Sequence, residues 1–206
     1  MIKVQNMAYF RKSLYPVMNF PAEMKHFKNI NGEDLPFLAD FVASGNWGWG
    51  GYLDKRENMY VAPHFHSLRK IHVGMDIWAP VGEPVFAPLP GVVSYTANHN
   101  RNGDYGATVV IKHISSNDDL FVLYAHLSKK SLQMSKPGKK VESGDLIGWI
   151  GNDKENGNWP PHLHLQISTQ DPGSADMPGV VSEKELNKAL KQFPDPRILL
   201  EKFLGK

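Results

Sequence analysis

Short apolar runs broken by turn residues fill the middle of this chain and restrict its fold more than any other feature. From about residue 61 to 168, runs rich in Val, Ile, Phe and Tyr alternate with Gly, Pro, Asn and Asp. Such runs are typical of strands, and the frequent turn signals favour antiparallel connections. The clearest runs are "GEPVFAPLPGVVSYTA" (82–97), "GATVVIKHI" (106–114), "LFVLYAHL" (120–127) and "DLIGWIG" (145–151). We therefore predict a β-rich α+β protein with an antiparallel sheet as its core.

The first 60 residues differ in character from this core. Residues 1–60 are mixed and aromatic-rich, and we predict an N-terminal extension that packs on or near a groove of a central domain spanning 61–170. Within it, "GNWGWGGY" (45–52) has no clear period. We interpret this stretch as an irregular loop whose tryptophans pack on the main body. A flap beside a binding cleft is the alternative.

The C-terminus is predicted to be helical. Residues 171–206 are expected to form a C-terminal helical extension of the same domain. In 182–193, Ser182 and Glu185 form a capping box. One apolar helical face follows, made of Leu186, Leu190 and Phe193. Pro194 ends this helix, and residues 195–205 are expected to form a second short helix on the sheet.

Composition excludes several classes of protein. The chain has 206 residues, enough for one domain with a sizeable core, and a net charge of +2, too small to indicate a nucleic-acid partner. The absence of cysteine excludes disulfides and thiolate metal sites. No run is long enough for a membrane span. The N-terminus lacks the apolar core of a signal peptide, so we expect a cytoplasmic chain or one exported by a non-standard route. Nothing in the sequence indicates an oligomeric state.

Two histidines share one face of an apolar strand in "PPHLHLQI" (160–167). Residues i and i+2 of a strand point the same way, so His162 and His164 stand side by side while the leucines point to the opposite face. A buried core strand gains nothing from paired imidazoles, whereas a metal site does. We expect His164 to bind the metal and His162 to lie beside the water or the substrate oxygen.

The segment "HVGMD" (72–76) supplies two more donors. A neutral imidazole from His72 and a carboxylate from Asp76 are both good zinc ligands, and Gly74 between them permits a backbone turn that a β-carbon would resist. With His164 they make three protein ligands. Three ligands leave a fourth position open for water, which is the pattern of a catalytic zinc site.

A further histidine lies late in another apolar strand. His126 occurs in "YAHLS" (124–128), flanked by Leu123, Tyr124 and Leu127. A polar group in such surroundings is costly unless it is hydrogen-bonded or functional. Taken alone, His126 is interpreted as a structural histidine.

These pieces in their order resemble the lysostaphin/LytM-type zinc metallopeptidases of family M23, which are peptidoglycan endopeptidases. The pieces are His72-Val-Gly-Met-Asp76, Tyr124-Ala-His126-Leu127 and His162-Leu-His164, and the resemblance covers about 65–168. It implies an antiparallel sheet whose groove carries one Zn²⁺ per chain. It also implies that His72, Asp76 and His164 are the zinc ligands and that His126 and His162 are catalytic. Either of these two histidines is a candidate for the general base.

The resemblance implies a zinc endopeptidase acting on peptidoglycan stem peptides or cross-bridges. Two alternatives stay open, because "ENGNWPP" (155–161) replaces the small-residue segment common in the family and no signal peptide is seen. They are a cytoplasmic zinc hydrolase of small peptide or amino-acid-like substrates, and a non-catalytic regulator that uses the LytM fold. A further hypothesis is that residues 45–60 supply a side chain to the open zinc position. The remaining histidines are expected to lie outside the site: His26, His64, His66, His99 and His113.

Overall fold

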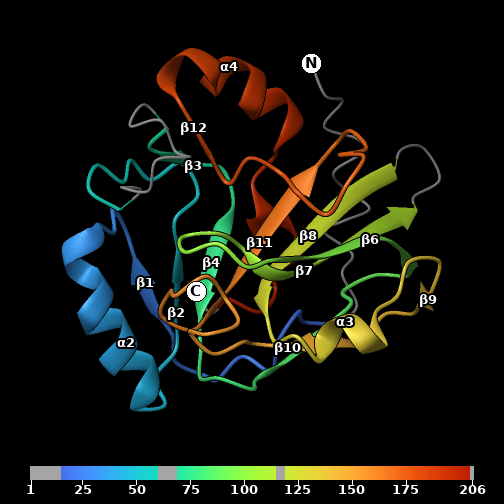
Figure 1. Cartoon of the computed structure of the whole chain (residues 1–206), viewed down its shortest axis with the longest axis horizontal. Coiled ribbons are helices and arrows are strands. Elements are labelled where there is room, and N and C mark those ends of the chain that lie inside the picture. Colours follow the sequence, from blue (N-terminus) through green and yellow to red (C-terminus); the bar gives the residue numbers. More distant parts are fainter. Residues whose placement is uncertain (1–14, 60–68, 115–118, 205–206) are drawn as a thin grey trace.

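An eight-stranded sheet crosses the molecule in the computed structural model, which describes residues 15–59, 69–114 and 119–204 (Figure 1). Its strands are β1 (Lys25–Phe27), β2 (Gly48–Gly50), β4 (Met75–Trp78), β6 (Gly91–His99), β7 (Gly106–Ile114), β8 (Asp119–Leu127), β9 (Lys140–Val141) and β11 (His162–Ser168). Their order is β1-β2-β4-β11-β8-β7-β6-β9, and all neighbours are antiparallel except β1 and β2. The predicted antiparallel core is confirmed.

Smaller elements surround this sheet. The remaining strands pair in twos: β5 (Pro84–Phe86) with β10 (Leu146–Trp149), and β3 (Ile71–His72) with β12 (Val180–Val181). The helices are α2 (Leu35–Ala43), α3 (Ser131–Met134) and α4 (Glu183–Gln192), with 3-10 turns η1 (Gly32–Asp34) and η3 (Pro196–Leu199). Within the described ranges, none of these helices has the length and apolar character that crossing a lipid bilayer requires.

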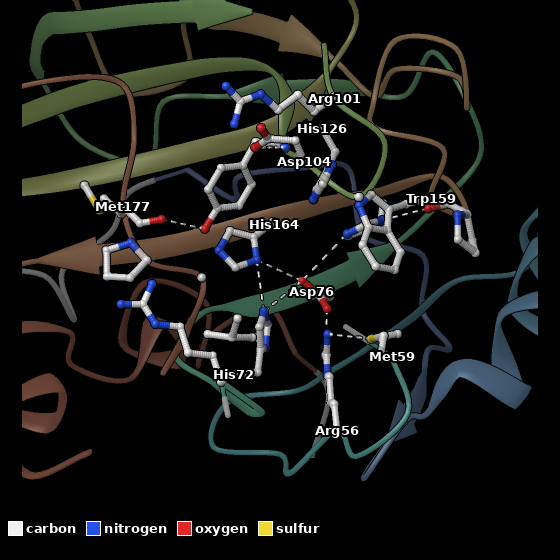
Figure 2. A pocket seen from close by; sticks show the side chains of 18 of the residues that line it. Arg56, Met59, His72, Asp76, Arg101, Asp104, His126, Trp159, His164 and Met177 are labelled. Atoms are coloured by element: carbon white, nitrogen blue, oxygen red, sulfur yellow. Dashed lines mark hydrogen bonds and ion pairs between the residues drawn. The ribbon is translucent and has the colours of Figure 1, made fainter. Parts of the chain in front are cut away.

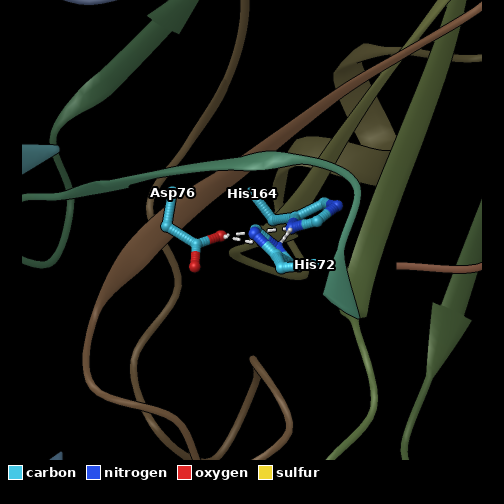
Figure 3. Close-up of side chains that lie close together, drawn as sticks. All are labelled: His72, Asp76 and His164. Carbon is cyan, nitrogen blue, oxygen red and sulfur yellow. Dashed lines mark hydrogen bonds and ion pairs between the residues drawn. The ribbon is translucent and has the colours of Figure 1, made fainter. Parts of the chain in front are cut away.

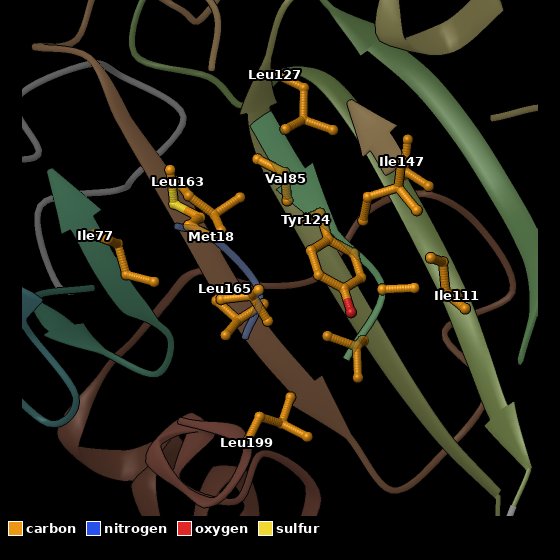
Figure 4. Close-up of a cluster of buried hydrophobic side chains, with 14 of the residues drawn as sticks. Met18, Ile77, Val85, Ile111, Tyr124, Leu127, Ile147, Leu163, Leu165 and Leu199 are labelled. Carbon is orange, nitrogen blue, oxygen red and sulfur yellow. The ribbon is translucent and has the colours of Figure 1, made fainter. Parts of the chain in front are cut away.

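The main hydrophobic core lies on one face of the sheet (Figure 4). In β11, Leu163, Leu165 and Ile167 are fully buried in this core. Because side chains alternate along a strand, His162 and His164 point to the opposite face. The histidine face expected from the sequence is therefore present, and the fold presents it on the side of the sheet away from the main core.

The stretch read as an irregular loop contains a strand. Residues 48–50 form β2, which pairs with β4 in antiparallel register, so the loop interpretation of 45–52 is wrong at its centre. The glycines serve close approach between strands rather than a turn. A Cβ on Gly48 would lie 2.3 Å from the Phe27 ring, and one on Gly50 would lie 2.1 Å from the Phe27 carbonyl oxygen. The packing of Trp47 and Trp49 against the core was predicted and is confirmed.

The predicted C-terminal helix is present as α4, and Glu185 accepts a hydrogen bond from the Ser182 amide at 2.9 Å. The prediction of its apolar face is wrong at one residue. Leu190 is 41% exposed, while Ala189 is buried beside Phe193. The spacing of Ala189 and Phe193 follows the helix period, which turns Leu190 toward solvent. The second expected helix is the 3-10 turn η3, and its apolar residues join the main core.

Candidate metal centre and active site

Three buried side chains, those of His72, Asp76 and His164, converge on one point (Figure 3). His72 Nε2 lies 3.0 Å from His164 Nδ1, and Asp76 Oδ1 lies 3.1 Å from His164 Nδ1 and 3.5 Å from His72 Nε2. The ligand atoms of a tetrahedral zinc ion, each about 2.0–2.1 Å from the metal, lie about 3.3 Å apart. These donors therefore fit zinc. Two imidazoles and one carboxylate leave the fourth position open.

Strand pairing produces this convergence. Asp76 on β4 and His164 on β11 are direct partners in the antiparallel register, so their side chains leave the same face of the sheet. Gly74 lies between His72 and Asp76, and a Cβ there would be 2.3 Å from His164 Cε1. The backbone bends at Gly74 as expected, and its φ lies outside the left-handed region, so the need for glycine comes from space and not from backbone dihedral freedom. Gly74 makes room for the His164 imidazole.

Hydrogen bonds behind the two imidazoles fix which nitrogen faces the centre. The Gly51 carbonyl oxygen can only accept, so His72 Nδ1–H donates to it at 3.0 Å and Nε2 keeps its lone pair. Gln166 donates its amide to the Pro178 carbonyl oxygen at 3.2 Å, which turns its Oε1 toward His164 Nε2 at 3.0 Å. His164 therefore keeps its lone pair on Nδ1. Both lone pairs point to the same place, as metal-binding histidines require.

The Asp76 carboxylate has a different partner on each oxygen. Oδ1 faces the two imidazoles, and Oδ2 accepts a hydrogen bond from Arg56 at 2.7 Å (Figure 2). Burial raises the pKa of the Asp76 carboxyl, but the charge of the neighbouring Arg56 guanidinium opposes this effect, and that pKa lies well below its usual range. Burial, reinforced by the Arg56 charge, holds the pKa of His72 well below its ordinary value. An ionised carboxylate thus faces a neutral imidazole, which are the forms that bind metal.

Two further histidines lie next to the three donors. His126 lies near the end of β8 and His162 begins β11, and their ring centroids are 4.2 Å apart. Each donates its Nδ1–H to a backbone carbonyl oxygen, His126 to Asn156 at 2.8 Å and His162 to Pro160 at 2.7 Å. Burial lowers the pKa of both imidazoles. Both rings are therefore neutral, with a free lone pair on Nε2.

The backbone at His126 is strained. Its φ of 62° lies in the left-handed region, which costs a residue other than glycine about 1–2 kcal/mol. Two backbone hydrogen bonds hold it there, from His126 N to Tyr105 O and from Gly151 N to His126 O, both 2.9 Å long. Strain held by its surroundings is typical of functional sites. Here it orients the His126 ring toward His162.

All five predicted site residues line one pocket of about 460 Å³ (Figure 2). This volume is typical of small-molecule and peptide-sized clefts. Segments far apart in the sequence form the rest of the wall, among them Arg69, Arg101, Tyr105, Trp159, Pro160, Met177 and Pro178. Trp159 and Pro160 belong to "ENGNWPP" (155–161), the segment that departs from the family pattern, and both lie in the wall of this pocket.

The other histidines lie away from this pocket lining where the structure describes them. His113 is buried, with Nδ1 3.1 Å from the Pro90 carbonyl oxygen and Nε2 3.2 Å from the Tyr124 hydroxyl. His99 ends β6 and binds the carbonyl oxygen of Ala175, and His26 stacks on Trp49 in the strands at the sheet edge. His64 and His66 fall outside the described residues.

Sequence reasoning missed three residues that hold the site: Arg56, Asn156 and Gln166. Gln166 follows His164 by two positions on a strand, so the alternation that paired the histidines also predicts its direction. Arg56 and Asn156 lie in loops. They contact Asp76 and His126, which are 20 and 30 residues away in the sequence. No local pattern reveals such contacts. Arg56 belongs to the segment expected to fill the open metal position, but it is a cation and pairs with Asp76 instead.

Comparison with known proteins gives one family match. The model of peptidase family M23 matches residues 70–176. The DD-carboxypeptidase/endopeptidase Mpg of Neisseria meningitidis serogroup B is 36% identical over 104 residues, which cover 50% of this chain and 21% of that protein. The peptidoglycan DD-endopeptidase ShyA of Vibrio cholerae is 38% identical over 96 residues, 47% of this chain and 20% of that protein.

Among solved structures, a zinc-containing peptidase from Vibrio cholerae is similar, with 30% identity and a TM-score of 0.39. The match covers 48% of this chain and 27% of that one. This chain thus spans about a fifth of the length of the first curated relatives that it matches.

Proposed function

Because this chain belongs to peptidase family M23, we propose that it is a zinc-dependent endopeptidase that hydrolyses peptide bonds in the stem peptides or cross-bridges of peptidoglycan. The observation that carries the proposal is the convergence of His72, Asp76 and His164, with donor atoms 3.0–3.5 Å apart. Similarity to a protein named as a peptidoglycan DD-endopeptidase supports the substrate class.

The three donors would hold the ion through His72 Nε2, Asp76 Oδ1 and His164 Nδ1. When bound, zinc polarises a carbonyl oxygen and lowers the pKa of a water ligand to about 7. The intact donor set supports an enzyme rather than a non-catalytic regulator, because such a regulator has no need of an open coordination position.

His126 and His162 are proposed to transfer protons between the attacking water and the leaving amine. In the neutral state, Nε2 of each ring can only accept, because Nδ1 carries the proton. One ring therefore accepts a proton from the attacking water as general base. Its Nε2–H then donates to the developing oxyanion or to the leaving amine. With ring centroids 4.2 Å apart, a charge on one imidazole opposes a charge on the other, so the pair takes up only one additional proton at a time.

A digest tests this proposal. Zinc-loaded protein would be incubated with purified peptidoglycan and with short stem and bridge peptides, and new amino termini would be read by mass spectrometry. His164→Ala should lose both zinc and cleavage, whereas His126→Ala and His162→Ala should keep zinc and lose cleavage. His26→Ala, which changes a histidine in β1 outside the pocket lining, is the matched control and should cleave normally.

Two outcomes would contradict the proposal. Cleavage by metal-stripped His164→Ala would exclude zinc chemistry at this site. Cleavage of short peptides without cleavage of peptidoglycan would favour a hydrolase of small peptides. The proposed substrate lies outside the cytoplasmic membrane, so the proposal also requires the chain to reach the cell wall, which fractionation of the producing cells would test.

A further inference from the structure

A cation from outside the family-matched segment reaches the metal centre. Arg56 lies between β2 and β3, before residues 70–176. Its Nη2 lies 2.7 Å from Asp76 Oδ2, and the two side chains are only 3% and 2% exposed (Figure 2). This contact is a buried ion pair made on the outer oxygen of a proposed metal ligand.

The turn that carries Arg56 also holds His72. The Gly51 carbonyl oxygen accepts from His72 Nδ1 at 3.0 Å, and backbone hydrogen bonds join His72 to Leu53 and Asp54 at 2.9 and 3.0 Å. Gly51 has a φ of +102°, and a Cβ there would lie 2.3 Å from Arg56 Nη2. The missing side chain leaves the space through which the guanidinium passes. One turn therefore fixes two of the three metal donors.

This pairing determines how Asp76 can bind a metal. A carboxylate offers one or two oxygens to an ion. Oδ2 is occupied by Arg56, so Oδ1, 3.1 Å from His164 Nδ1, is the oxygen that faces the centre. A buried carboxylate without a partner strongly destabilises a fold, so Arg56 also stabilises the metal-free protein. A divalent ion and a guanidinium on one carboxylate repel each other, which weakens metal binding.

We propose that Arg56 is a positioning residue for the metal centre and the counter-ion of its Asp76 carboxylate. It holds Asp76 as a one-oxygen ligand, stabilises the metal-free protein and limits the affinity for zinc. This inference rests on the proposed metal site but not on the peptide substrate.

The test compares Arg56→Gln with Arg69→Gln in the full chain. Arg69 lines the same pocket and pairs with Glu185 at 3.1 Å, with both side chains about two-fifths exposed. Its replacement removes the same charge without touching a metal donor. Three quantities are measured: the thermal unfolding of the metal-free protein, the zinc dissociation constant by competition with a chromophoric chelator, and the visible absorption of the cobalt-substituted protein.

Arg56→Gln should lower the melting temperature of the metal-free protein and tighten zinc binding by roughly tenfold or more, because the repulsion between the two cations is removed. Its cobalt absorption should weaken, since a second carboxylate oxygen raises the coordination number. Arg69→Gln should keep the wild-type zinc affinity and cobalt spectrum. An unchanged cobalt spectrum of Arg56→Gln, or zinc binding no tighter than wild type, would overturn the inference.

Two further outcomes are decisive. If metal-free Arg56→Gln does not fold, refolding in excess zinc should recover the native circular dichroism. Absence of recovery would mean that Arg56 serves the fold and not the metal centre. Wild-type protein that binds neither zinc nor cobalt would contradict the metal site itself, whereas normal wild-type binding with an unaltered Arg56→Gln would contradict this inference alone.

Discussion

Replacing Gln166 by leucine would remove the group that fixes the tautomer of His164. Gln166 is fully buried on β11, accepts from His164 Nε2 at 3.0 Å and donates to the Pro178 carbonyl oxygen at 3.2 Å. Leucine has a similar volume but no polar atoms. The substitution therefore leaves an imidazole N–H and a carbonyl oxygen without these partners, while the apolar packing changes little.

The expected losses of stability and of zinc affinity follow from these two contacts. Each of the two buried polar groups left unpaired costs about 1–3 kcal/mol, so the free energy of unfolding should fall by about 2–6 kcal/mol. Without its acceptor, the His164 proton can move to Nδ1, the atom that faces the metal centre. Loss of such an outer partner typically lowers metal affinity by about 10–100-fold, and we expect zinc binding to weaken within that range.

Ser168→Ala is the matched control for this prediction. Ser168 is also buried on the same face of β11, and its hydroxyl donates to the Gln170 carbonyl oxygen at 2.7 Å, away from the metal donors. Its loss should cost about 1 kcal/mol of stability without a change in zinc affinity. Urea unfolding and zinc titration of both variants separate the two effects. If Gln166→Leu bound zinc as tightly as wild type, the tautomer argument would be refuted.

Three other predictions concern single residues. Gly74→Ala should abolish stoichiometric zinc binding in a dialysis assay, because the new methyl group would lie 2.3 Å from the His164 ring; retained zinc would contradict this packing. At His126, whose φ is 62°, valine should be less stable than asparagine by about 1–2 kcal/mol in urea unfolding, since asparagine tolerates the left-handed region; equal stabilities would argue against strain. Burial lowers the pKa of His113 from 6.5 to about 4, so between these pH values the unfolded chain binds a proton that the folded chain does not. Stability should be complete above pH 6.5 and fall by roughly 3 kcal/mol toward pH 4. Urea unfolding at neutral and acidic pH should show a shallower acid loss for His113→Gln, and an identical loss would contradict the assignment.

The predictable part of the fold follows from local patterns. The strands between 82 and 151 and the helix after Ser182 are set by alternation, turn residues and a capping box, all of which lie within a few neighbouring residues. Strand β2 was missed because its glycines resemble turn residues. Their role is to let Phe27 approach the sheet, which depends on a strand more than 20 residues earlier.

In the candidate site, too, local patterns predict some residues and miss others. The histidine pair on β11 could be read from the spacing of His162 and His164, and the fold brings both to the pocket that contains His72 and Asp76. The contact between Arg56 and Asp76 could not be predicted from the sequence, because it depends on how the turn that carries Arg56 packs against β4. The sequence therefore predicts the candidate donors, whereas the contact of Arg56 with one of them is seen only in the structure.

We infer that His72, Asp76 and His164 hold one zinc ion. The most direct measurement is the zinc content of the purified chain after equilibrium dialysis, compared with His164→Ala and with the control His26→Ala. We expect one zinc ion per chain for wild type and for His26→Ala, and none for His164→Ala. Equal zinc content in His164→Ala and wild type, or none in wild type, would contradict it.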